Sequence, residues 1–397
     1  MTSLTRRSLM GRAAAGGCAA LVPAAFAGPS RAVQSLAIDM FVPFAPTPVV
    51  VEGRSHTVYE LHITNMGQLT LTLQQLDVAD HATGQVWRSW SGADLNGMLA
   101  RPGTTGLADP ASIGLASIGP GLRAVAFIDI VGDTAAAPSQ VLSHRLVFAP
   151  ISLPNAGAVQ TDVSGGVVQL NAARPVVLGP PLSGDGWLAS HGLSNTSSHR
   201  RSLLTLDGQA SIAQRFAIDW TRIGADGQIF RGDPASNANW TPYGSEVLAV
   251  ADGRVVGLLD GLAENDPTAD NKAVPITFDT APGNHLVLDI GDGRFVLYAH
   301  LKPGGLKVGA GDRVVRGQVL AALGNSGKSD APHLHFQVMN GPAPLASEGL
   351  PFVFERFTLQ GHVASLAAFV DGTGWRATEA ASMRRHEIPL ENAVISF

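Results

Sequence analysis

The sequence predicts a mainly β protein built from two successive halves, and three observations lead to this prediction. First, 45 glycines and 25 prolines accompany only 6% aromatic residues, which favours short strands and tight turns over long helices. Second, 45% of the 397 residues are hydrophobic and 15% are charged, so the chain can bury sizeable cores. Third, apolar and polar residues alternate with period two in the first half, and short strand-like runs separated by glycine turns fill the second.

The first 27 residues are typical of a twin-arginine-type signal peptide. Two arginines in the run 5–10 (TRRSLM) precede an uncharged stretch, residues 13–27, that is short for a membrane span and ends in an A-x-A pattern. We therefore expect a periplasmic or secreted protein with no stable membrane span in its mature form. Cys18, the only cysteine, leaves open a lipoprotein site instead of a cleaved signal. If the signal is cleaved, any metal must be bound by histidine and carboxylate.

Residues 35–172 are expected to form an antiparallel, immunoglobulin-like β-sandwich with one face of each strand buried and the other wet. The alternation that predicts it is found in four segments: 57–64, 69–73, 125–130 and 142–148. Its histidines are scattered along the chain, which favours structural roles: His56, His62, His81 and His144. We expect this half to be a spacer, a binding module or a cover for the second half. If it is a cover, removing the residues before Ser183 would raise activity.

Residues 173–186 are rich in glycine and proline and are predicted to be a linker. Short strands resume over residues 187–354, which form the second domain. The remaining residues, 355–397, form a C-terminal extension with a candidate short helix around residues 377–385.

The segment 332–338 (PHLHFQV) is the most informative about chemistry. Residues i and i+2 of a strand point to the same face, so His333 and His335 would reach one point in space. The pair stands in a context of further short motifs, in this order: Asp219, GSEVLA (244–249), DG (252–253), GN (283–284), YAHL (298–301), GDRVVRGQ (311–318), GNSG (324–327) and HLHF (333–336).

This series of motifs resembles the lysostaphin/LytM-type zinc metallopeptidases, a murein endopeptidase-like family, over residues 187–354. The resemblance implies a LytM-type β barrel-sandwich hybrid domain, a Zn²⁺ cofactor and a peptidoglycan or peptide substrate. A biotinyl/lipoyl-like β-hammerhead shares the GDRVVRGQ turn, but it gives no reason for Asp219, His300 and the HLHF segment together. No H-E-x-x-H motif is present, so a glutamate-based zincin mechanism has no support.

The resemblance also implies residue roles. Asp219 and His335 match metal ligands, and His300 and His333 match catalytic histidines. Zinc with three protein ligands keeps a fourth position for water, whose pKa it lowers. The two catalytic imidazoles would then move protons to and from the reacting groups and stabilise the developing negative charge.

One metal ligand of the family pattern, H-x-x-x-D, is missing, because Arg215 stands four residues before Asp219 and a guanidinium cannot ligate a metal. Asp207-Gly208 predicts a hairpin that would bring His199 opposite Arg215 if its loop has three residues, and would turn it away if the loop has two. We predict that His199 is the third ligand; otherwise the metal site is lost or weak. His191, in a Gly/Ser/Asn loop further upstream, is the poorer candidate.

Two main functions remain at this point. The first is an exported zinc metalloendopeptidase that hydrolyses peptide bonds in peptidoglycan cross-links or stems, with peptides outside the wall as a further possibility. The alternative is a catalytically degenerate LytM-like module that binds or regulates cell-wall hydrolases. Because the net charge is −5 and no basic stripe is present, we expect no nucleic-acid partner.

Overall fold

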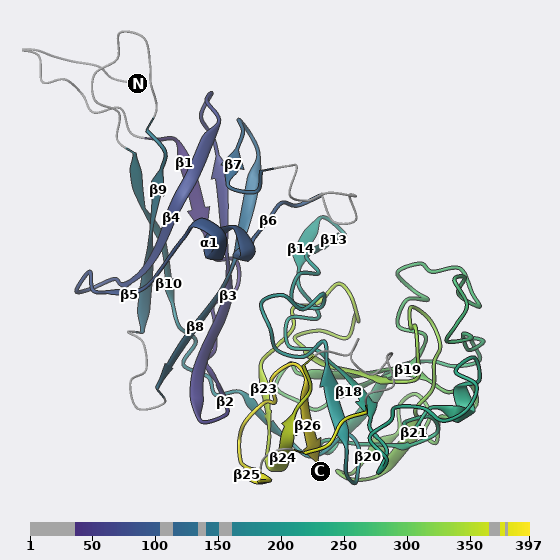
Figure 1. The fold of residues 1–397 in the computed structure, drawn as a ribbon. Coiled ribbons are helices and arrows are strands. Elements are labelled where there is room, and N and C mark those ends of the chain that lie inside the picture. Colours follow the sequence, from purple (N-terminus) through teal and green to yellow (C-terminus); the bar gives the residue numbers. More distant parts are fainter. Residues whose placement is uncertain (1–35, 104–113, 134–139, 151–160, 365–373, 378–379) are drawn as a thin grey trace, which may run out of the picture.

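A computed structural model of the chain describes residues 36–103, 114–133, 140–150, 161–364, 374–377 and 380–397. The predicted signal peptide lies outside these residues. The mainly β fold is confirmed: an elongated body of N-terminal strands stands on a rounder C-terminal body (Figure 1). The described residues contain one α-helix, α1 (Gly92–Met98). No helix in this part of the chain is long and apolar enough to cross a membrane.

The N-terminal half is a sandwich of two five-stranded antiparallel sheets. The first sheet has the order β1-β3-β8-β6, with β2 paired to β3: β1 (Ile38–Phe41), β2 (Val49–Val51), β3 (Arg54–Asn65), β6 (Leu99–Ala100) and β8 (Arg123–Asp133). The second has the order β10-β9-β4-β5, with β7 paired to β4: β4 (Leu71–Asp80), β5 (Val86–Ser91), β7 (Ser117–Ile118), β9 (Val141–Phe148) and β10 (Asp162–Gln169).

The strand β3 departs from the expected alternation of buried and wet residues. Ten of its twelve residues are buried, although β9 alternates as predicted. Tyr59, Leu61 and Ile63 belong to the sandwich core, whereas Val58 belongs to the core of the C-terminal half. The second face of β3 is therefore dry because the C-terminal half packs against it.

The C-terminal half is organised around one ten-stranded antiparallel sheet. Its strands, in spatial order, are β20 (Arg313–Val314), β17 (Gly253–Leu259), β18 (Asn284–Asp289), β19 (Phe295–Leu301), β22 (Leu334–Met339), β15 (Ile218–Arg222), β12 (Trp187–Ser190), β26 (Ala393–Ser396), β24 (Phe357–His362) and β25 (Ser382–Arg384). Three two-stranded sheets complete it: β13 (Leu204–Leu206) with β14 (Gln209–Ser211), β16 (Glu246–Leu248) with β21 (Val319–Ala322), and β11 (Val176–Leu178) with β23 (Phe352–Phe354).

The chain after residue 355 completes this sheet. β26 pairs with β12, and β24 and β25 continue the sheet beyond it. The predicted helix around residues 377–385 is wrong, since Ser382–Arg384 forms strand β25, where pairing with β24 overrides the local propensity. In the stretch predicted to be a linker, β11 pairs in parallel with β23.

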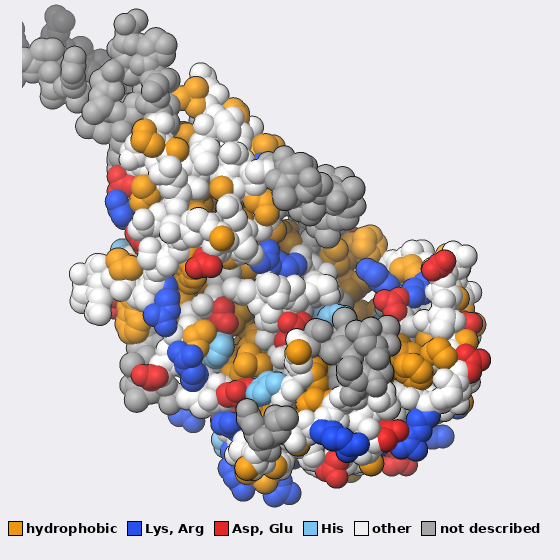
Figure 2. Space-filling view, viewed as in Figure 1, with side chains coloured by type: hydrophobic (Ala, Val, Ile, Leu, Met, Phe, Trp, Pro, Cys, Tyr) orange, Lys and Arg blue, Asp and Glu red, His pale blue; other side chains and the backbone are white. Residues whose placement is uncertain are grey.

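A large aromatic core lies beneath the ten-stranded sheet and is shared by both halves of the molecule. Trp187, Trp220, Phe336 and Phe354 are all at most 1% exposed, so these two tryptophans are core residues. The sandwich contributes Val49, Val51 and Val58 to the same core. On the outer surface, acidic and basic side chains are intermixed over the face seen in Figure 2.

Candidate metal centre and active site

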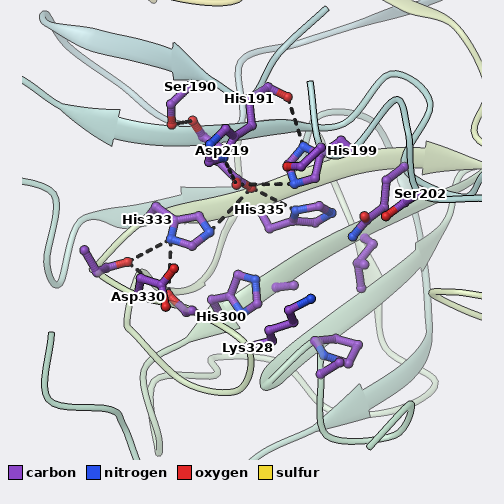
Figure 3. Close-up of a pocket in the computed structure, with 18 of the residues that line it drawn as sticks. Ser190, His191, His199, Ser202, Asp219, His300, Lys328, Asp330, His333 and His335 are labelled. Atoms are coloured by element: carbon purple, nitrogen blue, oxygen red, sulfur yellow. Dashed lines mark hydrogen bonds and ion pairs between the residues drawn. The ribbon is translucent and has the colours of Figure 1, made fainter. Parts of the chain in front are cut away.

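The centre of the site is built from two neighbouring strands of the large sheet. Asp219 of β15 is the direct antiparallel partner of His335 of β22, which places their side chains on the same face. His335 Nδ1 lies 2.8 Å from Asp219 Oδ1, and His333 Nε2, two residues earlier, lies 3.4 Å from the same oxygen. The prediction that both histidines of the HLHF segment reach one point is therefore met (Figure 3).

His300 reaches the same cluster from β19, the other neighbour of β22. Its ring centroid lies 4.7 Å from that of His333 and 5.8 Å from that of His335. Its backbone φ of +60° is unusual for a residue other than glycine, and such conformations concentrate at functional sites. Its Nδ1 donates to the carbonyl oxygen of Ser326 at 2.8 Å, so the ring orientation is fixed. The four residues Asp219, His300, His333 and His335 thus converge as the family resemblance implied.

Two further histidines approach Asp219 from the loop 191–203. His191 Nδ1 lies 3.2 Å and His199 Nε2 3.3 Å from Asp219 Oδ2. Together with Asp219 they form a three-residue group whose ligand atoms all lie within 4.8 Å of one another. His199 therefore lies where the predicted third ligand should be, and the less favoured His191 lies beside it.

The route by which His199 reaches the centre differs from the predicted one. The hairpin at Asp207-Gly208 is present, but its loop has two residues, since Leu206 pairs with Gln209. In that register His199 would pair with Phe216 and point away. The ladder ends at Leu204, however, and His199 lies in a turn before it, free of the strand alternation.

A signal for His191 is present in the sequence but depends on a non-local pairing. β12 pairs with β15 so that Ser190 lies opposite Asp219. The next residue, His191, has a φ of +50° and leaves the strand beside the carboxylate. A strand predicted at residues 187–190 would place His191 beside Asp219 only if the partner strand and its register were already known.

The hydrogen bonds of His199 and His335 assign the tautomers of their imidazole rings. His199 Nδ1–H donates to the carbonyl oxygen of His191 at 3.0 Å, which leaves the Nε2 lone pair facing Asp219. Gln337 Nε2 donates to the carbonyl oxygen of Pro344 at 2.9 Å, so its Oε1 accepts from His335 Nε2 at 2.8 Å. His335 Nδ1 then also presents a lone pair to Asp219. Lone pairs facing a carboxylate require a proton or a cation between them, so this donor set fits a metal ion such as Zn²⁺.

The electrostatics of the cluster separate the roles of its members. Burial would raise the pKa of Asp219, but the imidazoles of His199 and His333 hold that pKa well below its usual range. Burial, with His333 and His335 nearby, lowers the pKa of His300 well below its usual value. Asp219 is therefore a permanent carboxylate, and His300 is a neutral imidazole with a free lone pair at neutral pH.

A cavity of about 820 Å³ opens beside the cluster. Its wall is largely apolar, with Trp240, Ile276, Phe278 and Leu345 next to the polar centre, which is typical of a substrate site. All residues that line it come from position 190 onward, and no described residue of the sandwich is among them. The expectation that the sandwich covers the cleft is therefore not met by the described part of the chain.

Arg215, where the family pattern has a metal histidine, has a structural role instead. Its Nη2 lies 2.9 Å from Oε2 of Glu60 and 2.7 Å from Oε2 of Glu348, and its Nη1 donates to the carbonyl oxygen of Gly349 at 3.1 Å. Its guanidinium also stacks 5.2 Å from the ring centroid of Phe44. Arg215 thus bonds the β15 entry segment to the sandwich.

The family comparison covers part of the chain that forms this site. Residues 240–346 match the model of Peptidase family M23, so the chain contains an M23 peptidase domain and the resemblance to LytM/lysostaphin-type peptidases is confirmed. The matched segment includes His300, His333 and His335, whereas Asp219 and the loop 191–203 precede it. Among curated proteins, none matches the chain.

Three solved structures illustrate the likeness. The catalytic domain of lysostaphin from Staphylococcus simulans is 23% identical over 42% of this chain and 86% of its own, with a TM-score of 0.22. The catalytic domain of the prophage-encoded M23 protein EnpA from Enterococcus faecalis is 17% identical over 45% and 93%, with a TM-score of 0.25. A zinc-containing peptidase from Vibrio cholerae is 16% identical over 72% and 79%, with a TM-score of 0.22. Because these TM-scores are below 0.5, we draw no functional conclusion from them.

Proposed function

We propose that this protein is a zinc metalloendopeptidase that hydrolyses peptide bonds in peptidoglycan cross-links or stems. The observation that carries the proposal is the carboxylate of Asp219 faced by imidazole nitrogens whose lone pairs point at it, beside an open cavity. Asp219, His199 and His335 would hold the zinc ion. When bound, zinc with three N/O ligands lowers the pKa of a water molecule and polarises the scissile carbonyl.

The remaining histidines are positioned for proton transfer. His333 Nδ1 donates to the carbonyl oxygen of Ala331 at 2.8 Å, and His300 Nδ1 donates to that of Ser326. Both rings therefore present Nε2 to the reacting groups in an oriented form. We assign to this pair the removal of the water proton, its delivery to the leaving amine, and stabilisation of the negative charge on the carbonyl oxygen.

A second function, a LytM-like module that binds or regulates cell-wall hydrolases without cleaving, is favoured by Arg215 at the usual ligand position. Against it, a module without a metal has no physical need for lone pairs directed at a buried carboxylate. The two functions differ in whether new amino termini appear in the substrate.

The deciding experiment uses full-length, zinc-loaded protein and purified peptidoglycan. We expect new free amino groups without new reducing ends, because the reaction cleaves amide bonds and leaves glycosidic bonds intact. His300→Ala and His333→Ala should retain zinc and lose cleavage. His285→Ala is the matched control, since His285 lies on β18, does not line the cavity, and has its Nδ1 2.8 Å from the carbonyl oxygen of Gly283. Zinc binding without cleavage of peptidoglycan or peptides would favour the binding module.

We further propose that the protein is exported by the twin-arginine route to the periplasm or beyond the cell. The support is the run 5–10 and the A-x-A pattern at residues 25–27. Cell fractionation of the wild-type protein and of a variant with both Arg6 and Arg7 changed to lysine tests this. Retention of the variant in the cytoplasm is the expected result, and equal export of both proteins would contradict it.

A further inference from the structure

The loop 191–203, which presents His191 and His199 to Asp219, is attached to the sandwich at several points. Asn195 Nδ2 donates to the carbonyl oxygen of Phe127 of β8 at 2.9 Å. Arg201 donates to the carbonyl oxygens of Leu99 at 3.1 Å and Gly97 at 2.6 Å. Neither Asn195 nor Arg201 lines the cavity.

A buried ion cluster fixes the centre of the same loop. Arg200, next to His199, forms an ion pair with Glu60 of β3, and both side chains are 1% exposed. Arg200 Nη2 also donates to the carbonyl oxygen of Tyr59 at 2.9 Å. Glu60 in turn bonds Arg215, so one carboxylate of the sandwich connects the loop to the segment that leads into β15.

Arg200 is the direct chain neighbour of His199, so the anchored backbone at Arg200 constrains the position of His199. The two residues are consecutive in a tight turn, and the His199 ring is held by the carbonyl oxygen of His191 in the same loop. A shift of Arg200 out of its buried pair would move His199 away from Asp219. Loss of an outer contact that orients a metal ligand typically lowers metal affinity by about 10- to 100-fold.

We propose that the N-terminal sandwich is a structural part of the metal site, with Glu60 as a positioning residue that acts through Arg200 on His199. This inference rests on the proposed zinc site. This role differs from the cover that was one of three roles expected for the sandwich: the described contacts hold the loop 191–203, and no described residue of the sandwich lines the cavity. His199 takes the place of the family's metal histidine, which is Arg215 in this chain. The loop that carries His199 is held by the sandwich.

The test measures zinc affinity of the full-length protein by competition with a chelator. Glu60→Gln should weaken zinc binding about 10-fold, the lower end of the loss for a direct outer contact to a ligand, because Glu60 acts on His199 only through Arg200. The effect should be non-additive with His199→Ala, because Glu60 acts through His199. Glu52→Gln is the matched control: Glu52 bonds His362 of β24 at 2.6 Å, so it also joins the two halves but lies away from the loop. It should leave zinc affinity within about twofold, as expected for a residue that bonds His362 and not the loop 191–203.

The outcomes separate the two proposals. Zinc binding by the wild type that is unchanged in Glu60→Gln, or effects that add in the double variant, would overturn the role of the sandwich and leave the zinc site standing. No zinc in the wild type, even after reconstitution, would overturn the zinc site itself. Should Glu60→Gln not fold, Asn195→Ala tests the attachment of the loop to the sandwich by the same zinc competition, since it removes the bond to the carbonyl oxygen of Phe127 and leaves no buried charge unpaired. Unchanged zinc affinity in that variant would overturn the role of the sandwich.

Discussion

The two sides of the metal centre are positioned in different ways. Asp219 and His335 lie on paired strands of the large sheet, where backbone hydrogen bonds fix their register. His199 lies in a turn that has no ladder of its own and is held by contacts with the other half of the molecule. The positions of Asp219 and His335 depend on the pairing of β15 with β22, whereas the position of His199 depends on contacts between its loop and the sandwich. This difference predicts how substitutions on each side will behave.

The largest expected effect concerns the segment that leads into the sheet side. Arg215→Met should lower the free energy of unfolding by about 3 kcal/mol, because it leaves Glu60 and Glu348 with fewer partners in a buried site. Urea denaturation of the full-length protein measures this. Arg231→Met, which breaks an exposed pair with Asp226, should leave the denaturation midpoint nearly unchanged, because water screens this pair. Equal midpoints for the two variants would show that the buried cluster does not secure the segment.

On the sheet side of the centre, His335→Ala should reduce zinc affinity by more than about 100-fold, since it removes a ligand rather than an outer contact. The fold should persist because the backbone pairing of β22 does not depend on this side chain. Zinc competition and far-UV circular dichroism together test the prediction. Unchanged zinc content would remove His335 from the ligand set.

On the loop side, His199→Ala should reduce zinc affinity by about 10- to 100-fold, less than His335→Ala, because the Asp219–His335 pair remains in its strand register. The same chelator competition measures it. A loss as large as that of His335→Ala would mean that the loop ligand is as rigidly placed as the strand ligand. Unchanged zinc affinity would mean that a residue other than His199 is the third ligand.

The smallest effect is expected for His191→Ala, below about 10-fold in zinc affinity. Its side chain is 48% exposed, so water can replace its hydrogen bond to Asp219 Oδ2. If the affinity instead falls as far as in His199→Ala, His191 is a direct ligand, which the close grouping of His191, His199 and Asp219 would accommodate.

The sheet side of the site could be predicted from the sequence because its information is local. The spacing of His333 and His335 fixes a common face, and the order of the family motifs adds Asp219 and His300. The loop side could not be predicted in the same way. His199 was selected through a hairpin register that the structure does not extend to it, and Glu60, 139 positions earlier, gave no sign in the sequence of its contact with Arg200.

The same reasoning applies to the fold. Period-two alternation identified β3, β8 and β9, because a strand with one buried face shows that face in its sequence. It did not indicate that the second face of β3 would be covered, nor that Ser382–Arg384 would be a strand, since both depend on partners distant in the chain.

The strand β3 has a consequence for how the molecule unfolds. Its opposite faces contribute Leu61 to one hydrophobic core and Val58 to the other, so neither core can lose β3 without exposing the second. The two halves are therefore thermodynamically coupled through one strand, and heating should melt them in a single calorimetric transition rather than in two. A zinc ion bound at Asp219 and His335, on the middle strands β15 and β22 of the C-terminal sheet, would then raise the melting temperature of the sandwich as well.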